Sequence, residues 1–201
     1  MPMKFQPETP WKLRLPAVAA LCLLASCGGG SGGSTDPGPE PEQAGITFMA
    51  GSTVTRNLGE PGWVSNLMGV AAADDGTVFV GDLDTIRKVD SSGFVTLVAG
   101  TPGVTGSTDG PVLQARFNGP ASLVFDAAGN LYVAEKYANH IRKISPSGEV
   151  STWVGDGDCR TGDGAGVAAS ICNPSQLAIN SAGTVYVASL GALRRIDKAG
   201  N

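Results

Sequence analysis

The sequence has few of the residues that most catalytic and metal sites require. One of its 201 residues is a histidine, His140, and 16% are charged. A single histidine supplies neither a three-histidine metal site nor a histidine-based triad. Glycine-rich phosphate loops, nucleophile elbows and paired-histidine zinc helices are also absent from the sequence. We therefore predict no catalytic and no metal-binding residue, and expect His140 to pack or hydrogen-bond between strands as a turn residue.

An excess of positive charge is absent as well. Fourteen Lys and Arg stand against eighteen Asp and Glu, for a formal net charge of −4. Nucleic-acid binding needs a basic face, so the composition argues against it. Basic pairs do recur, as Arg87-Lys88, Arg142-Lys143 and Arg194-Arg195. On strands, their long stems are expected to lie along apolar neighbours with the charges in water; a basic patch for anionic glycans or lipid headgroups is the alternative.

The apolar run at residues 15–25 is too short for a permanent membrane span. It has eleven residues, whereas a transmembrane helix needs roughly 20. Lys4, Lys12 and Arg14 precede it, and a basic start before a short apolar run is typical of a secretory signal. The run ends in Leu24-Ala25-Ser26-Cys27, which resembles the bacterial lipobox.

That resemblance implies that Cys27 is lipidated and becomes the mature N-terminus, anchoring the chain to a membrane. An ordinary signal peptide with a chance cysteine is the alternative. Gly28 in place of an aspartate implies sorting to an outer membrane. We therefore expect a bacterial cell-envelope lipoprotein with a signal peptide at 1–26 and a Gly/Ser/Pro-rich tether at 27–45.

The sequence has four cysteines. Cys22 lies in the segment expected to be removed and Cys27 is expected to carry the lipid, so two cysteines remain to pair. Cys159 and Cys172 form an even pair in an oxidising compartment, which predicts a disulfide. Metal ligation by two cysteines without a nearby histidine is the weaker alternative.

Glycine is abundant, at 29 residues, about twice the average usage of roughly 7%, and it recurs at a fixed period. Gly76, Gly129 and Gly183 lie 53 and 54 residues apart, and Asp109-Gly110 recurs 54 residues later as Asp163-Gly164. Each unit holds short apolar runs separated by hairpin-length turns. Four antiparallel strands with a period near 50 predict a propeller blade.

The second unit resembles the NHL repeat. It reads Gly129-Asn130-Leu-Tyr-Val-Ala-Glu135, then Asn139-His140-Ile141-Arg142-Lys143-Ile144 and Gly148. The likeness covers residues 69–201; unit one departs with Asp84-Thr85 and unit three with Gly191-Ala192. It implies an all-β fold, a β-propeller of four-stranded antiparallel NHL-type blades.

About three blades are expected within the propeller region 46–201, at residues 67–100, 120–155 and 174–201. Residues 47–51 (TFMAG) echo residues 96–100 (TLVAG), so 46–51 are predicted to be a closing strand that pairs with the third strand of a final blade. Because propellers have about four to eight blades, we expect a truncated six-bladed propeller.

Acidic and amide residues near the strand ends are the candidate ligand-facing groups. Asp82 and Glu135 come directly after the second strand, where the third unit has Ser189 instead, and Asp126 and Asn180 follow the first strand. Such a set can bind a divalent cation such as calcium, although a structural role in the turns is favoured. Asp109 and Asp163 are predicted to N-cap short helices.

The function predicted from these features is non-catalytic. We expect a membrane-anchored propeller whose loops bind a protein or a glycan, with no cofactor. The alternative is a metal-dependent enzyme, lactonase- or lyase-like, with its site on the central channel. The first strands are apolar at residues 70–73, 123–125 and 177–179, which favours binding, because the fold itself hosts both kinds of function.

Overall fold

The computed structural model describes Val64 and residues 66–201. The predicted signal peptide, the tether with Cys27 and the closing strand at 46–51 lie outside the described residues. Within the described part, no helix is long and apolar enough to cross a membrane.

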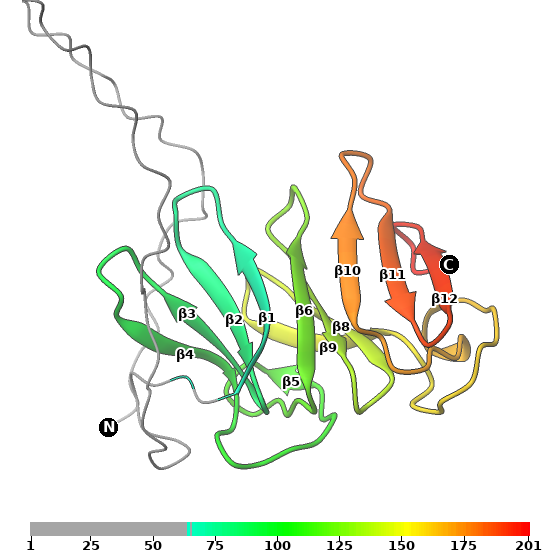
Figure 1. Ribbon diagram of the computed structural model, residues 1–201, viewed down its shortest axis with the longest axis horizontal. Coiled ribbons are helices and arrows are strands. Elements are labelled where there is room, and N and C mark those ends of the chain that lie inside the picture. Colours follow the sequence, from blue (N-terminus) through cyan, green and yellow to red (C-terminus); the bar gives the residue numbers. More distant parts are fainter. Residues whose placement is uncertain (1–63, 65) are drawn as a thin grey trace, which may run out of the picture.

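Three antiparallel sheets stand side by side in an arc (Figure 1). Blade one contains β1 (Leu67–Ala72), β2 (Val78–Asp82), β3 (Thr85–Val89) and β4 (Val95–Gly100) in that order. Blade two contains β6 (Pro120–Phe125), β7 (Leu131–Glu135), β8 (His140–Ile144) and β9 (Glu149–Val154), and blade three contains β10 (Gln176–Ile179), β11 (Val185–Ser189) and β12 (Ala192–Ile196). The strands fall within the three predicted units, so the all-β, repeated-blade prediction is confirmed.

Side chains on the two faces of the second strand of blade two pack in the spaces between neighbouring blades. All five residues of β7 are buried. Leu131 and Val133 join Phe79 and Ile86 of blade one in one apolar cluster. Tyr132 and Ala134 join Val185 and Val187 of blade three in another. Successive residues of a strand point to opposite faces, so residues 131–134 of β7, which contact a neighbouring blade on each side, are all apolar.

The turns between the first and second strands are built alike in all three blades. Gly76, Gly129 and Gly183 have φ angles of 84°, 81° and 79°, in the left-handed region that glycine enters without strain. The repeat of glycine found in the sequence thus marks one turn position in each blade.

Two local predictions failed. The structure places no helix after Asp109: Gly110–Pro111 form β5, a short extra strand on the edge of blade two that pairs with β9. After Asp163 a three-residue 3₁₀ helix, η1, spans Gly166–Ala168, but the residue at its N-cap is Ala165. Both aspartates instead pair with arginines, because a full positive charge competes better for a carboxylate than the N–H groups of a short helix do.

Candidate binding surface at the long-loop end

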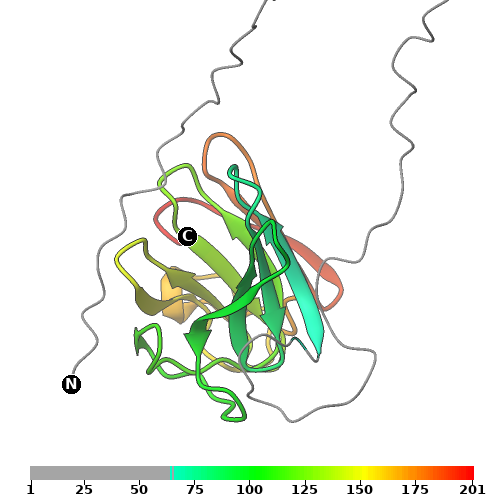
Figure 2. The ribbon, with the colours of Figure 1, turned by 90° about the vertical axis from the view of Figure 1, so that its left-hand side faces the viewer.

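The strands of each blade have two different ends. Short turns join first to second and third to fourth strands at one end, and we call this the short-turn end. The loops between blades, residues 101–119 and 155–175, lie at the other end together with the turns between second and third strands, which we call the long-loop end. Figures 1 and 2 show the short turns above and the long loops below.

Arg142 on β8 holds the first long loop from inside the protein. Its Nη1 lies 3.0 Å from Glu135 Oε2 and donates to the carbonyl of Arg116 at 3.1 Å. Its Nη2 donates to the carbonyl of Thr108 at 3.0 Å and to Asp109 Oδ1 at 2.5 Å. Arg142 and Glu135 are both 0% exposed. The prediction that this arginine extends its charge into water is therefore wrong, since two carboxylates and two carbonyls accept hydrogen bonds from its two Nη groups.

Arg194 on β12 repeats this arrangement for the second long loop. Nη1 donates to the carbonyl of Ser170 at 2.5 Å, and Nη2 donates to the carbonyl of Gly162 at 3.0 Å and to Asp163 Oδ1 at 2.6 Å. Each partner lies 54 residues after its counterpart in blade two. Arg87 of blade one is also buried and lies 3.2 Å from Asp82. The first basic residue of each pair is therefore a structural residue, not part of a basic patch.

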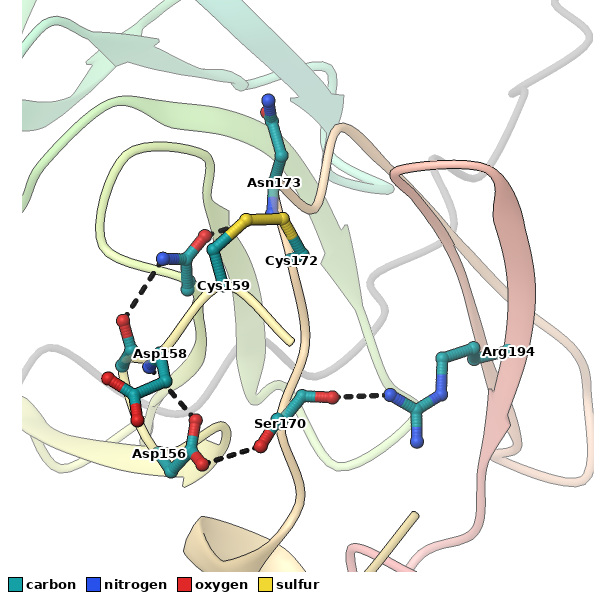
Figure 3. The surroundings of a disulfide bond; sticks show 9 residues. Asp156, Asp158, Cys159, Ser170, Cys172, Asn173 and Arg194 are labelled. Carbon is teal, nitrogen blue, oxygen red and sulfur yellow. Dashed lines mark hydrogen bonds between the residues drawn. A yellow bond between two sulfur atoms is a disulfide. The ribbon is translucent and has the colours of Figure 1, made fainter. Parts of the chain in front are cut away.

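A disulfide joins Cys159 to Cys172, as predicted, and closes the second long loop (Figure 3). Asn139 in the β7–β8 turn donates from Nδ2 to the carbonyl of Gly157 at 3.0 Å and accepts from the backbone N–H of Asn173 at 2.9 Å. Inside the loop, Ser170 Oγ donates to Asp156 Oδ2 at 2.5 Å, and this hydrogen bond lowers the pKa of Asp156. The loop is thus fastened to blade two, to blade three and across itself.

The four candidate ligand-facing residues do not come together. Asp82 and Glu135 are 4% and 0% exposed and engage buried arginines, so they are corrected from ligand-facing to interior residues. A buried carboxylate needs such a partner. The other two lie at the short-turn end. Asn180 Oδ1 accepts from the backbone N–H of Thr184, and Asp126 accepts from the backbone N–H groups of Ala128 and Asn130.

The position of Asp126 also affects the pKa of the neighbouring Tyr132. Burial raises the pKa of Tyr132 to about 12, and the adjacent Asp126 carboxylate adds to this effect. Burial opposes ionisation of Asp126 itself, but hydrogen bonds led by those from Asn130 outweigh it and lower its pKa. His140, half-buried at the start of β8, lies with Nδ1 3.7 Å from Glu135 Oε2. No group of three or more His, Cys, Asp or Glu suited to a metal occurs among the described residues.

An exposed aromatic side chain at the long-loop end, Tyr137, was not among the residues predicted from the sequence. It lies in the β7–β8 turn and is 58% exposed. One side of its ring rests on Gly119 (φ 69°), where a Cβ atom would overlap the ring. The Lys136 ammonium lies 5.7 Å from the ring centroid. A signal was present: this turn has four residues, 136–139, whereas the equivalent turns of the other blades have two.

Comparison with known proteins gives relatives over part of the chain. No family model matches. Teneurin-3 of Danio rerio is 31% identical over 141 residues, which is 60% of this chain and 5% of that protein. Teneurin-4 of Homo sapiens is 30% identical over 142 residues, again 60% and 5%. The chain thus corresponds to about a twentieth of the length of these curated relatives.

Solved structures resemble the described sheets. A Bacteroides thetaiotaomicron protein of unknown function has a TM-score of 0.58 and 23% identity, covering 60% of this chain and 32% of its own. An auxiliary nutrient binding protein of Bacteroides ovatus has a TM-score of 0.53 and 20% identity, covering 63% and 36%. At these identities the likeness concerns the fold. Together with the three repeated sheets it establishes a β-propeller fold of antiparallel blades, three of which lie within the described residues.

Proposed function

We propose that this chain is an extracytoplasmic, lipid-anchored binding module that holds a protein or glycan ligand at the long-loop end and performs no catalysis. The observation that carries the proposal is Tyr137, a largely exposed aromatic side chain on a rigid base. Tyrosine supplies a large contact area at low cost in conformational entropy, and exposed aromatic anchors dominate many binding surfaces.

The surroundings of Tyr137 support this role. The arginines of β8 and β12 fix both flanking loops through main-chain carbonyls, and the disulfide closes the second loop. A surface that is ordered before the ligand arrives loses less entropy on binding. Two structures of similar fold, from Bacteroides ovatus and Bacteroides thetaiotaomicron, are described as auxiliary nutrient binding proteins, which agrees with a binding role.

The test compares two exposed aromatics at opposite ends. Tyr137→Ala removes the aromatic of the long-loop end, and Phe94→Ala removes one that is 63% exposed in the β3–β4 turn at the short-turn end. Mobility of the mature protein in gels containing a panel of soluble polysaccharides measures affinity. We expect Tyr137→Ala to weaken binding about tenfold or more, which corresponds to about 1.4 kcal/mol, while Phe94→Ala leaves it unchanged.

Equal binding by both variants contradicts the assignment of the surface. If no polysaccharide slows the wild-type protein in the gel, the glycan ligand is excluded. The protein ligand is then tested with the same two variants. The enzyme alternative has a separate measurement: elemental analysis of purified full-length protein. A tightly held cation at one equivalent per chain contradicts a non-catalytic module. Replacing Cys27 by Ser tests the anchor, and should move the protein from the membrane fraction to the soluble fraction.

A further inference from the structure

The second strand of each blade ends on a residue whose chemistry differs between the blades. In blade two it is Glu135, whose Oε1 accepts from the backbone N–H of Asn118 at 3.0 Å and whose Oε2 accepts from Arg142 Nη1 at 3.0 Å. In blade one it is Asp82, which accepts from the backbone N–H of Asn66 at 2.7 Å and pairs with the arginine of the third strand. Both blades therefore hold a buried carboxylate between a main-chain N–H group and an arginine.

Blade three keeps the frame of this arrangement but has no carboxylate in it. Its second strand ends on Ser189. In blades two and three the arginine lies opposite the residue two positions before this end, so Ser189 has the same register relative to Arg194 as its counterpart has to Arg142. Arg194 Nη1 also donates to the carbonyl of Ser170, the equivalent of the carbonyl that Arg142 Nη1 binds (Figure 3).

The hydrogen-bond donors that surround the carboxylate in blade two remain in blade three. Ser189 Oγ is buried and has no hydrogen-bond partner among the described residues. No described residue accepts from the backbone N–H of Cys172, which lies 54 residues after Asn118. Arg194 Nη1 makes the bond to the loop carbonyl but lacks the second acceptor that its counterpart has in Glu135. The three groups together call for an acceptor that carries a negative charge.

The charge of Arg194 also lacks a buried counterion. Its side chain is 17% exposed, and the acidic partner that it has among the described residues, Asp163, is 100% exposed. Water screens a fully exposed carboxylate, so such a pair contributes little. A guanidinium group that is largely buried is better compensated by an anion inside the protein, which in blade two is Glu135.

Blade three has smaller side chains around this position. Ala192 and Ile171 stand where blade two has His140 and Phe117, and serine is shorter than glutamate. These replacements remove side-chain volume next to the three donors. The serine is 7% exposed and the residue with the main-chain donor is 3% exposed, which restricts the site to a small anion.

We propose that blade three binds a chloride ion between Arg194, Ser189 Oγ and the backbone N–H of Cys172. The ion takes the place of the carboxylate that blades one and two supply from their own second strands. Chloride accepts hydrogen bonds from any direction, and those from a charged donor are stronger than neutral ones. The bound ion stabilises the contact between the second long loop and β12. This site is independent of the ligand proposed for the long-loop end.

Thermal unfolding of the mature protein in chloride and in gluconate measures this binding. Gluconate is too large for the buried site, and an ion that binds only the folded protein raises its Tm. At a constant ionic strength of about 0.15 M, chloride should give a Tm about 2–4 °C higher than gluconate. Bromide should act as chloride does. Equal values of Tm in chloride and gluconate overturn the proposal.

A pair of variants locates the effect. Ser189→Glu supplies the carboxylate from the chain itself, as in blade two, and should have the same Tm in chloride and in gluconate. Ser181→Glu adds the same charge at an exposed residue in the short turn of blade three, and should keep the difference seen in the wild type. If Ser189→Glu responds to chloride as the wild type does, the ion binds elsewhere and the proposal is wrong.

Bromide in crystals of the unaltered protein gives a measurement that needs no variant. Anomalous scattering from crystals soaked in sodium bromide should place one ion within hydrogen-bond distance of both Ser189 Oγ and Arg194 Nη1. Bromide ions found only at other positions, or none at all, overturn the proposal.

Discussion

Replacing Arg142 by methionine removes the guanidinium group that is paired with Glu135 in the interior of blade two. Both side chains are 0% exposed, and Arg142 Nη1 lies 3.0 Å from Glu135 Oε2. The variant leaves an uncompensated carboxylate in the protein interior. Breaking a buried pair in this way typically costs about 3–5 kcal/mol. With a urea m-value of about 2 kcal/mol/M, the midpoint of unfolding should fall by about 2 M.

Arg194→Met is the matched comparison within the same chain. Arg194 makes the same bonds to loop carbonyls, but Ser189 stands where blade two has Glu135, and the Asp163 side chain is 100% exposed. Its loss orphans no buried charge. The cost should be that of a few hydrogen bonds, about 1–2 kcal/mol. Urea titrations followed by tryptophan fluorescence on the wild type and both variants give the two differences directly.

A third variant separates charge burial from lost packing. Glu135→Gln in the Arg142→Met background replaces the orphaned carboxylate by a neutral amide, and should recover part of the lost free energy of unfolding. Equal destabilisation by Arg142→Met and Arg194→Met, or no recovery in the double variant, would refute the reasoning that the buried charge dominates.

Three further predictions concern single features of the fold. Gly119→Ala should destabilise more than Gly76→Ala, by about 1–3 kcal/mol. Both glycines have positive φ, but a Cβ at Gly119 overlaps a tyrosine ring while one at Gly76 meets nothing; thermal unfolding of both variants measures the difference. The mature protein should have a mass two hydrogens below the reduced value, and Cys159→Ser/Cys172→Ser should lower the free energy of unfolding by about 3 kcal/mol, as urea titration would show. Burial raises the pKa of Asp84 above its usual 3.8, so its ionisation destabilises the folded state as the pH rises above that value. Asp84→Asn should therefore be more stable than the wild type at pH 7, with the advantage shrinking as the pH falls toward 4; a constant advantage at all pH values would contradict this.

The repeat and its strands were predictable because they follow from local patterns. Alternation, turn glycines and the spacing of Val80, Val133 and Val187 place the second strand of each blade without reference to distant residues. The disulfide was predictable for a similar reason, since Cys159 and Cys172 are the two cysteines of the repeat region 46–201. The strands were predicted from patterns within one repeat unit, and the disulfide from the number of cysteines.

The failures involve side-chain contacts between different strands and loops, which the local sequence pattern does not reveal. The residues next to Asp109 predicted that it caps a helix. Its actual partner, Arg142, lies 33 residues away, so the neighbouring sequence does not reveal this contact. Glu135 was expected to face a ligand because nothing nearby shows that the arginine seven residues later folds back onto it. The common 54-residue offset of Asp109 and Asp163 was a signal of this pairing, since the arginines recur with them.

The arginines on the third strands of blades two and three affect which mutations the long loops can tolerate. Arg142 and Arg194 each bind two main-chain carbonyls, and only one loop side chain apiece, Asp109 or Asp163. A carbonyl is present whatever the residue is. Mutations along the long loops can therefore accumulate without releasing the backbone, and the two loops already differ in most side chains. New ligand preferences can arise there by substitution alone, which also makes these loops suitable sites for grafting foreign recognition sequences.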